Sequence, residues 1–160
     1  MTIPQKKLSR ISEIIGTNQN ALEPKMAYLI DTDIIIYSLK GNALVQKWML
    51  DNQNIPKYIS VITYGELIYG ARKSKHPERN IATANRIAEL FPVIDISKGI
   101  IEVFGEIKAK LEVSGNRIDD MDLLIAATAM YMNFSLVTNN KSHFDRIDDI
   151  ILENWESKDA

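Results

Sequence analysis

The feature that most constrains the fold is an alternation of short apolar segments with longer amphipathic ones, starting at Tyr28. Apolar runs typical of strands lie at 27–31, 58–61, 92–96, 135–138 and 150–152. Helical spacing of apolar residues lies between them at 33–39, 43–53, 63–73, 77–90, 98–114, 119–132 and 141–145. Strands that alternate with such helices favour a parallel sheet covered on both faces. We therefore expect an α/β fold with a central, mostly parallel sheet of about four or five strands.

The composition indicates one ordinary domain with an extension. The chain has 160 residues, of which 46% are apolar and 25% charged, as in globular proteins. Residues 1–25 are more polar, and we predict a flexible N-terminal extension there, a domain at 26–155 and a C-terminal tail at 156–160. No apolar run approaches the ~20 residues of a membrane span. The lack of cysteine fits a reducing compartment, so we expect a cytoplasmic protein.

Two acids stand at the end of the first predicted strand. Asp31 follows its apolar residues directly, and Asp33 comes two residues later. An ionised carboxylate in a buried position costs several kcal/mol unless something pairs with it. Asp33 directly precedes the helical segment, so we expect Asp33 to cap that helix. This assignment leaves Asp31 without a structural role.

Three further polar residues are expected at the same edge of the sheet, because ligands of parallel sheets bind beyond the carboxyl ends of the strands. They are Glu66, Asp122 and Asn140. Each also has a purely structural interpretation. Thr63 and Glu66 match a capping box, in which Glu66 would fold back on the Thr63 amide. Asp122 could favour its helix dipole, and Asn140 could belong to an ordinary turn.

Several carboxylates in one pocket repel one another, and a divalent cation relieves that repulsion. Mg²⁺ or Mn²⁺ prefers oxygen ligands and can activate water against a phosphodiester. The chain has only two histidines, which leaves little material for a histidine-based site. Its net charge of −2 means that contact with a nucleic acid must be local. Candidate phosphate contacts are Arg117 and Lys141, and the cluster that includes Arg72 and Lys73.

Four stretches around these residues resemble the PIN-domain nucleases, specifically the VapC toxins of bacterial VapBC toxin–antitoxin pairs. They are Leu29–Ile34, Ile62–Ala71, Gly115–Ala129 and Leu136–Phe144. Pro77–Asn80 also resembles the VapC branch that cuts initiator tRNA. The resemblance covers about 26–155 and implies the PIN-like three-layer fold.

This resemblance implies a magnesium-dependent endoribonuclease. Asp31 and Asp122 would then bind the metal, Glu66 would complete the acidic centre, and Asp120 could add to the pocket. The fourth position of the family is often Asp and falls here on Asn140. The family also implies an RNA substrate, a homodimer, and a VapB-type antitoxin whose tail fills the active-site groove.

Other functions stay open on the sequence alone. A PIN nuclease of ribosomal RNA processing would carry the same acids, and a catalytically silent PIN fold could serve only for binding. A phosphatase of the haloacid dehalogenase type also starts with a strand and Asp-x-Asp. That class needs Thr or Val where Ile35 stands, so it fits least well.

Overall fold

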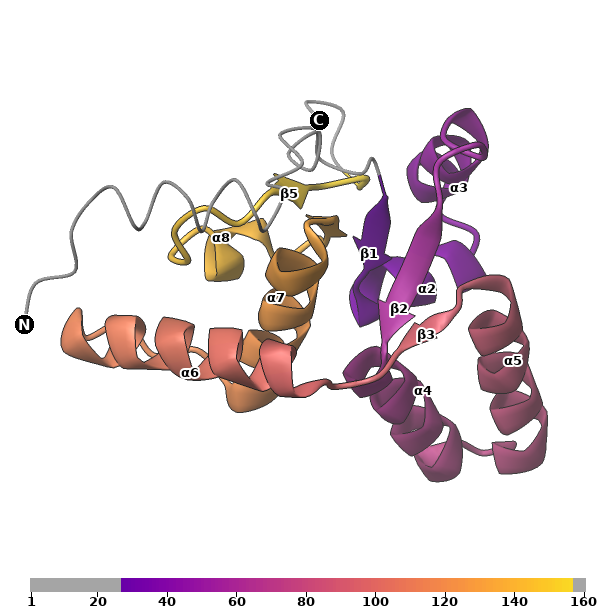
Figure 1. Ribbon diagram of the computed structural model, residues 1–160. Helices are drawn as coiled ribbons and strands as arrows, with labels where there is room; N and C mark the ends of the chain where they lie inside the picture. The colour runs from indigo at the N-terminus through magenta and orange to yellow at the C-terminus, as the bar shows by residue number, and fades with distance from the viewer. Residues whose placement is uncertain (1–26, 157–160) are drawn as a thin grey trace, which may run out of the picture.

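Residues 27–156, described by a computed structural model, form a five-stranded parallel sheet (Figure 1). The strands are β1 (Tyr28–Ile30), β2 (Lys57–Ser60), β3 (Val93–Ile94), β4 (Ser135–Val137) and β5 (Leu152–Glu153). Their order across the sheet is β3-β2-β1-β4-β5, and every pairing is parallel. The predicted parallel α/β sheet is confirmed.

The strand order reverses beside β1, and this reversal places the candidate site. The chain runs outward from β1 to β2 and β3, and then returns to the other side of β1 as β4 and β5. Ile30 of β1 pairs with Val137 of β4, so the residues that follow them, Asp31 and Thr138, lie side by side. Ligands of open α/β sheets bind at such a switch point, beyond the carboxyl ends of the strands.

Seven helices in the described residues cover the two faces of the sheet (Figure 1). They are α2 (Thr32–Leu39), α3 (Ala43–Asp51), α4 (Val61–Lys73), α5 (Pro77–Leu90), α6 (Lys98–Val113), α7 (Asp120–Met132) and α8 (Lys141–Phe144). Successive strand residues point to opposite faces. Leu29 accordingly packs in the core under α6 and α7, whereas Tyr28 and Ile30 pack in the core under α2, α3 and α5.

Most helix ends lie where the sequence predicts them. Asn133 ends α7 in the left-handed conformation with φ 55°, and Gly115 follows α6 with φ 74°. The start of α4 differs from the prediction, because β2 runs directly into the helix at Val61. Ser60 supplies the cap, since its hydroxyl oxygen accepts the Thr63 N–H at 3.0 Å.

The core extends nearly to the end of the described segment. Trp155 is fully buried, with its ring 5.1 Å from that of Tyr28 in an edge-on contact and 6.3 Å from that of Trp48 in a stacked one. The predicted extension at 1–25, and all but Glu156 of the predicted tail, lie outside the described residues. Within 27–156, none of the helices combines the length and apolarity that a membrane crossing requires.

Candidate active site

Asp31 stands at the end of the central strand and is 8% exposed. One carboxylate oxygen, Oδ1, accepts the Thr32 N–H at 2.8 Å, and Oδ2 accepts the Thr138 hydroxyl at 2.8 Å. Asp31 is therefore the N-cap of α2, and the expectation that Asp33 caps this helix is wrong. The reason is that α2 begins at Thr32, so the extended backbone that a cap needs falls on Asp31, with φ −76° and ψ 159°.

Asp33 instead joins α2 to the loop after β4. Its Oδ2 accepts the Asn139 N–H at 3.0 Å, and its Oδ1 is buried without a hydrogen-bond partner among the described residues. The Asn139 side chain continues this contact, because its amide donates to the Tyr37 hydroxyl at 3.2 Å. Asp33 thus fixes the segment that carries Asn140.

Glu66 reaches the same edge of the sheet from α4. Its Oε2 accepts the hydroxyl of Thr32, the residue next to Asp31. The capping-box alternative for Glu66 is wrong, because Ser60 caps α4 and Glu66 therefore lies in the second helical turn. The Glu66 carboxylate is exposed, so it is open to an added ligand.

Asp122 meets the loop after β4 through a histidine. Asp122 Oδ2 lies 3.0 Å from His143 Nδ1, and the Asn140 amide nitrogen lies 3.0 Å from the same ring atom. The backbone N–H of Asn140 donates to the Thr138 hydroxyl at 3.0 Å. Nδ1 can donate to Asp122 or accept from the Asn140 amide, but not both at once. Asn140 is therefore held by Thr138 through its backbone, and its side chain lies beside His143.

A continuous set of contacts links all four main candidates. Thr32 joins Glu66 to Asp31, Thr138 joins Asp31 to Asn140, and His143 joins Asn140 to Asp122. Sequence reasoning missed these three linking residues. Thr32 and Thr138 could have been noticed, because each is a hydroxyl residue at the carboxyl end of a strand. His143 lies three residues after Asn140, a spacing that brings side chains together at the start of a helix.

Two other acids near Asp122 have different partners. Asp119 caps α7, since its Oδ1 accepts the Met121 N–H at 2.9 Å. Asp120 contacts Lys108 Nζ with both oxygens, at 2.8 and 2.9 Å. Asp120 lies with Arg117 in a hollow between α6 and α7, and its addition to the acidic site stays a prediction.

The predicted phosphate contacts fall in three places. Lys141 is exposed and directly follows Asn140 at the start of α8. Arg117 is exposed in the hollow that holds Asp120. Arg72 and Lys73 are exposed in the last turn of α4, on the helix that carries Glu66. Of these residues, Lys141 is next to the site in sequence, and Arg117 lines the same hollow as the Lys108–Asp120 pair.

Burial dominates the electrostatics of the site. Burial is the largest of the effects that raise the pKa of Asp31 to about 7. The negative charges of Asp33 and Asp122 also raise this pKa, whereas the hydrogen bonds from Thr138 and Thr32 lower it. Burial also raises the pKa of Asp122, while His143 acts in the opposite direction. These carboxylates are held together against their repulsion, and a cation bound between them would relieve it.

The donor chemistry suits a small divalent cation. The side chains gathered at this edge offer carboxylate and amide oxygens, which Mg²⁺ and Mn²⁺ prefer. Across residues 27–156, no three histidine, aspartate or glutamate side chains form a closed ligand cluster. Mg²⁺ usually takes one or two carboxylates and keeps several waters, so it does not require a group of three such side chains.

Comparison with known proteins places this acidic edge in a family. The sequence profile of the PIN domain matches residues 28–150. Ribonuclease VapC2 of Haemophilus influenzae is 39% identical over 131 residues, which are 81% of this chain and 98% of that protein. The tRNA(fMet)-specific endonuclease VapC of Shigella flexneri is 31% identical over 130 residues, which are 81% of this chain and 98% of that protein.

Solved structures agree with these relatives. The VapBC2 complex of Rickettsia felis, bound to a promoter DNA fragment, contains a chain that matches with a TM-score of 0.75 and 37% identity, covering 81% of this chain and 99% of that one. A chain of the DNA-bound VapBC complex of Salmonella typhimurium matches with a TM-score of 0.76 and 33% identity, covering 81% of this chain and 98% of that one. The chain therefore belongs to the PIN-domain family and, within it, to the VapC ribonucleases. This membership excludes the haloacid dehalogenase alternative.

The raised pKa of Asp31 predicts a pH-dependent stability. The folded protein retains the Asp31 proton up to about pH 7, whereas the unfolded chain releases it near the ordinary value of 3.8. The stabilisation is therefore complete below pH 3.8 and is lost as the pH rises through 7. We expect metal-free wild-type protein to lose about 2 kcal/mol of unfolding free energy between pH 5.5 and 8 through this group. Urea unfolding in EDTA measures this change.

The matched variant for this prediction is Asp31→Asn, which is neutral at every pH. In EDTA at pH 8 it should unfold at a higher urea concentration than wild type, and the difference should shrink at pH 5.5. An Asp31→Asn variant that follows the wild-type pH profile would contradict the assigned pKa.

Thr138 provides a second prediction. Thr138→Val keeps the shape of the side chain but removes the hydroxyl that donates to Asp31 and accepts from the Asn140 N–H. We expect the rate of RNA cleavage to fall at least tenfold and the unfolding free energy to fall by about 1–3 kcal/mol, because polar groups lose their partners. Thr138→Ser retains the hydroxyl and should keep most of the activity. Equal cleavage rates for the valine and serine variants would contradict this role of Thr138.

Proposed function

We propose that this chain is the toxin of a toxin–antitoxin pair, which hydrolyses RNA phosphodiester bonds with Mg²⁺ or Mn²⁺ at the acidic edge of the sheet. The observation that carries the proposal is the position of Asp31. It is a buried acid at the strand switch point, connected by hydrogen bonds to Glu66 and to the loop that meets Asp122. Membership of the VapC ribonucleases supports the reaction class.

Asp31 and Asp122 would hold the cation, with Glu66 at the open side of the site. When bound, the cation supplies an activated water and neutralises charge on the phosphodiester. The residues of the chain do the positioning. Thr32 and Thr138 fix the two oxygens of Asp31 by hydrogen bonds that leave further lone pairs free. His143 holds Asp122 from the other side.

Asn140 has a different role from a carboxylate at the same position. Its amide carries no charge, so it adds nothing to the repulsion among the acids. Its backbone is held by Thr138, and its side chain lies beside His143. In this fixed position the amide can orient a water or a phosphate oxygen beside the cation.

We infer the partners and the substrate of this chain from those named for its relatives. The Rickettsia and Salmonella structures are VapBC complexes, so we propose a VapB-type antitoxin whose tail fills the acidic groove of this chain. We also propose a homodimer that acts in the cytoplasm. The Shigella relative is named as specific for tRNA(fMet), and we propose a tRNA as the substrate class here. Sequencing RNA 5′ ends after induced expression would identify the target.

Replacing a proposed ligand tests the reaction directly. Asp122→Asn removes one negative charge from the cation site while keeping the size of the side chain. We expect cleavage of total RNA in Mg²⁺ to fall at least a hundredfold, and growth inhibition on induced expression to disappear. EDTA should abolish wild-type cleavage, and added Mn²⁺ should restore it.

The control for this experiment is Lys98→Gln, an exposed change at the start of α6 that should retain wild-type cleavage. Circular dichroism should show the same folded spectrum for both variants. Full cleavage by Asp122→Asn, or cleavage that persists in EDTA, would contradict the metal-dependent reaction. An inactive wild type in every condition would favour a silent binding module instead.

A further inference from the structure

We propose that the tip of the α4–α5 hairpin binds the single-stranded RNA that flanks the cleaved bond. This inference rests on the proposed ribonuclease function and deepens it. The basic tip comprises five side chains in the last turn of α4, in the connection to α5 and in the first turn of α5: Arg72, Lys73, Lys75, His76 and Arg79.

The charge of the basic tip has no carboxylate partner within residues 27–156. All five side chains are exposed, and none of them forms a salt bridge within the described part of the chain. Glu78 is the one acid between positions 72 and 79. By contrast, five other basic residues are paired with carboxylates: Lys47, Arg86, Lys98, Lys108 and Lys110. On a protein of net charge −2, an unpaired basic cluster is a local site for phosphates.

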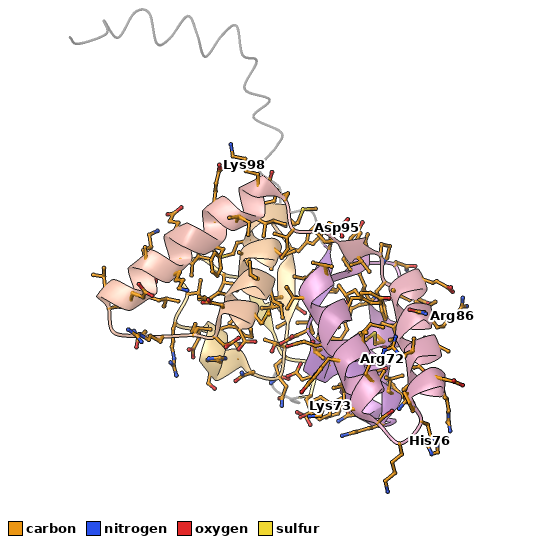
Figure 2. The ribbon with its side chains drawn as sticks, turned by 90° about the horizontal axis from the view of Figure 1, so that it is seen from below. Arg72, Lys73, His76, Arg86, Asp95 and Lys98 are labelled. Carbon is orange, nitrogen blue, oxygen red and sulfur yellow. The ribbon has the colours of Figure 1, made fainter. Side chains whose placement is uncertain are left out.

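The basic tip is aligned with the acidic site along one helix. Glu66, Tyr69 and Lys73 are spaced three and four residues apart, so they share one face of α4, and all three are exposed. The rise of a helix separates Glu66 from Lys73 by about 10 Å. Figure 2 shows Lys73 and His76 toward the lower edge of the view and Arg72 just above them, whereas Lys98 lies at the upper edge. An RNA strand leaving the acidic site along α4 therefore reaches the basic tip.

Tyr69 adds a surface for a base. Its side chain is 63% exposed, and Lys73 Nζ lies 5.0 Å from the centre of its ring. An exposed aromatic ring beside a cation can stack a base while the cation contacts a phosphate, which is how single strands are held without sequence preference. A Cβ added at Gly70, the next residue, would meet no other atom within 4 Å. Packing within the described residues therefore does not require a glycine at this position.

The chemistry of the basic tip favours RNA over a protein partner. Between positions 72 and 79 the one apolar side chain is that of Pro77, and the one acid is Glu78. A protein partner gains most of its affinity from apolar anchors. The nearby apolar hollow between α2, α4 and α5 is lined by Ile36, Leu67 and Ile87 and includes none of the five basic-tip residues.

Two triple variants of equal charge test the inference. The tip variant carries Arg72→Gln, Lys73→Gln and Arg79→Gln, and the control variant carries Arg86→Gln, Lys98→Gln and Lys110→Gln. Each loses three positive charges at exposed positions, so both have the same net charge. The probe is a fluorescein-labelled, mixed-sequence single-stranded RNA of about 20 nucleotides, long enough to cover a site of this kind. Anisotropy in EDTA at several KCl concentrations gives the Kd.

We expect the tip variant to bind this RNA at least tenfold more weakly than wild type at low salt. The slope of log Kd against log salt should fall by about 2, since each phosphate contact on a single strand contributes about 0.7. The control variant should match wild type in both quantities. Tyr69→Ala should raise Kd roughly tenfold without changing the salt slope, whereas Tyr69→Trp should restore binding.

Equal affinities of the tip and control variants would overturn the inference. A tip variant that keeps RNA affinity but escapes inhibition by the cognate antitoxin would also overturn it, by showing a protein-binding surface. The same RNA in Mg²⁺ separates this inference from the proposed function. A wild type that binds through the basic tip but does not cleave contradicts only the nuclease reaction. A wild type that cleaves, with unchanged binding by the tip variant, contradicts only the RNA contact.

Discussion

The hydrogen bond from the Thr138 hydroxyl to Asp31 connects two segments that are 107 residues apart in sequence. It spans the point where the strand order reverses, and it places a buried carboxylate between β1 and β4. The other members of the site are connected to this carboxylate through residues close in sequence to Asp31 and Thr138. Thr32 brings Glu66 from α4, and Asn140 brings His143 and Asp122 from the opposite side. The local fold is therefore arranged around one desolvated acid.

Much of the fold could be predicted because it depends on local patterns. The alternation of strands and helices determines a parallel sheet, and Asn133 and Gly115 mark helix ends by their backbone preferences. The position of Asp31, Glu66, Asp122 and Asn140 at one edge follows from strand direction and from family resemblance. The roles of Asp31 and Asp33 were assigned wrongly, because a shift of two residues in the helix start moves the cap from Asp33 to Asp31 and Asp33 into the first turn.

What the sequence could not provide are contacts between distant segments. The sequence places Thr138 at the end of a strand, but it does not show that this hydroxyl is buried and bridges β4 to Asp31. The same holds for Asp120, whose contact with Lys108 on α6 the sequence does not show. The unpaired state of Arg72 and Lys73 is likewise a property of the folded surface. Our two proposals assign catalysis to the acidic site, which Glu66 joins from α4, and RNA retention to the far end of the same helix.

The most direct measurement of the central claim is Mn²⁺ binding by isothermal titration calorimetry at pH 7, in two buffers of different ionisation enthalpy. With its pKa raised to about 7, Asp31 is half protonated before the cation binds. Binding to the ionised carboxylate should then release about half a proton from wild type. Asp31→Asn should bind Mn²⁺ far more weakly and release none of that proton. Equal Mn²⁺ affinity and equal proton release in the two proteins would contradict a cation site built on Asp31.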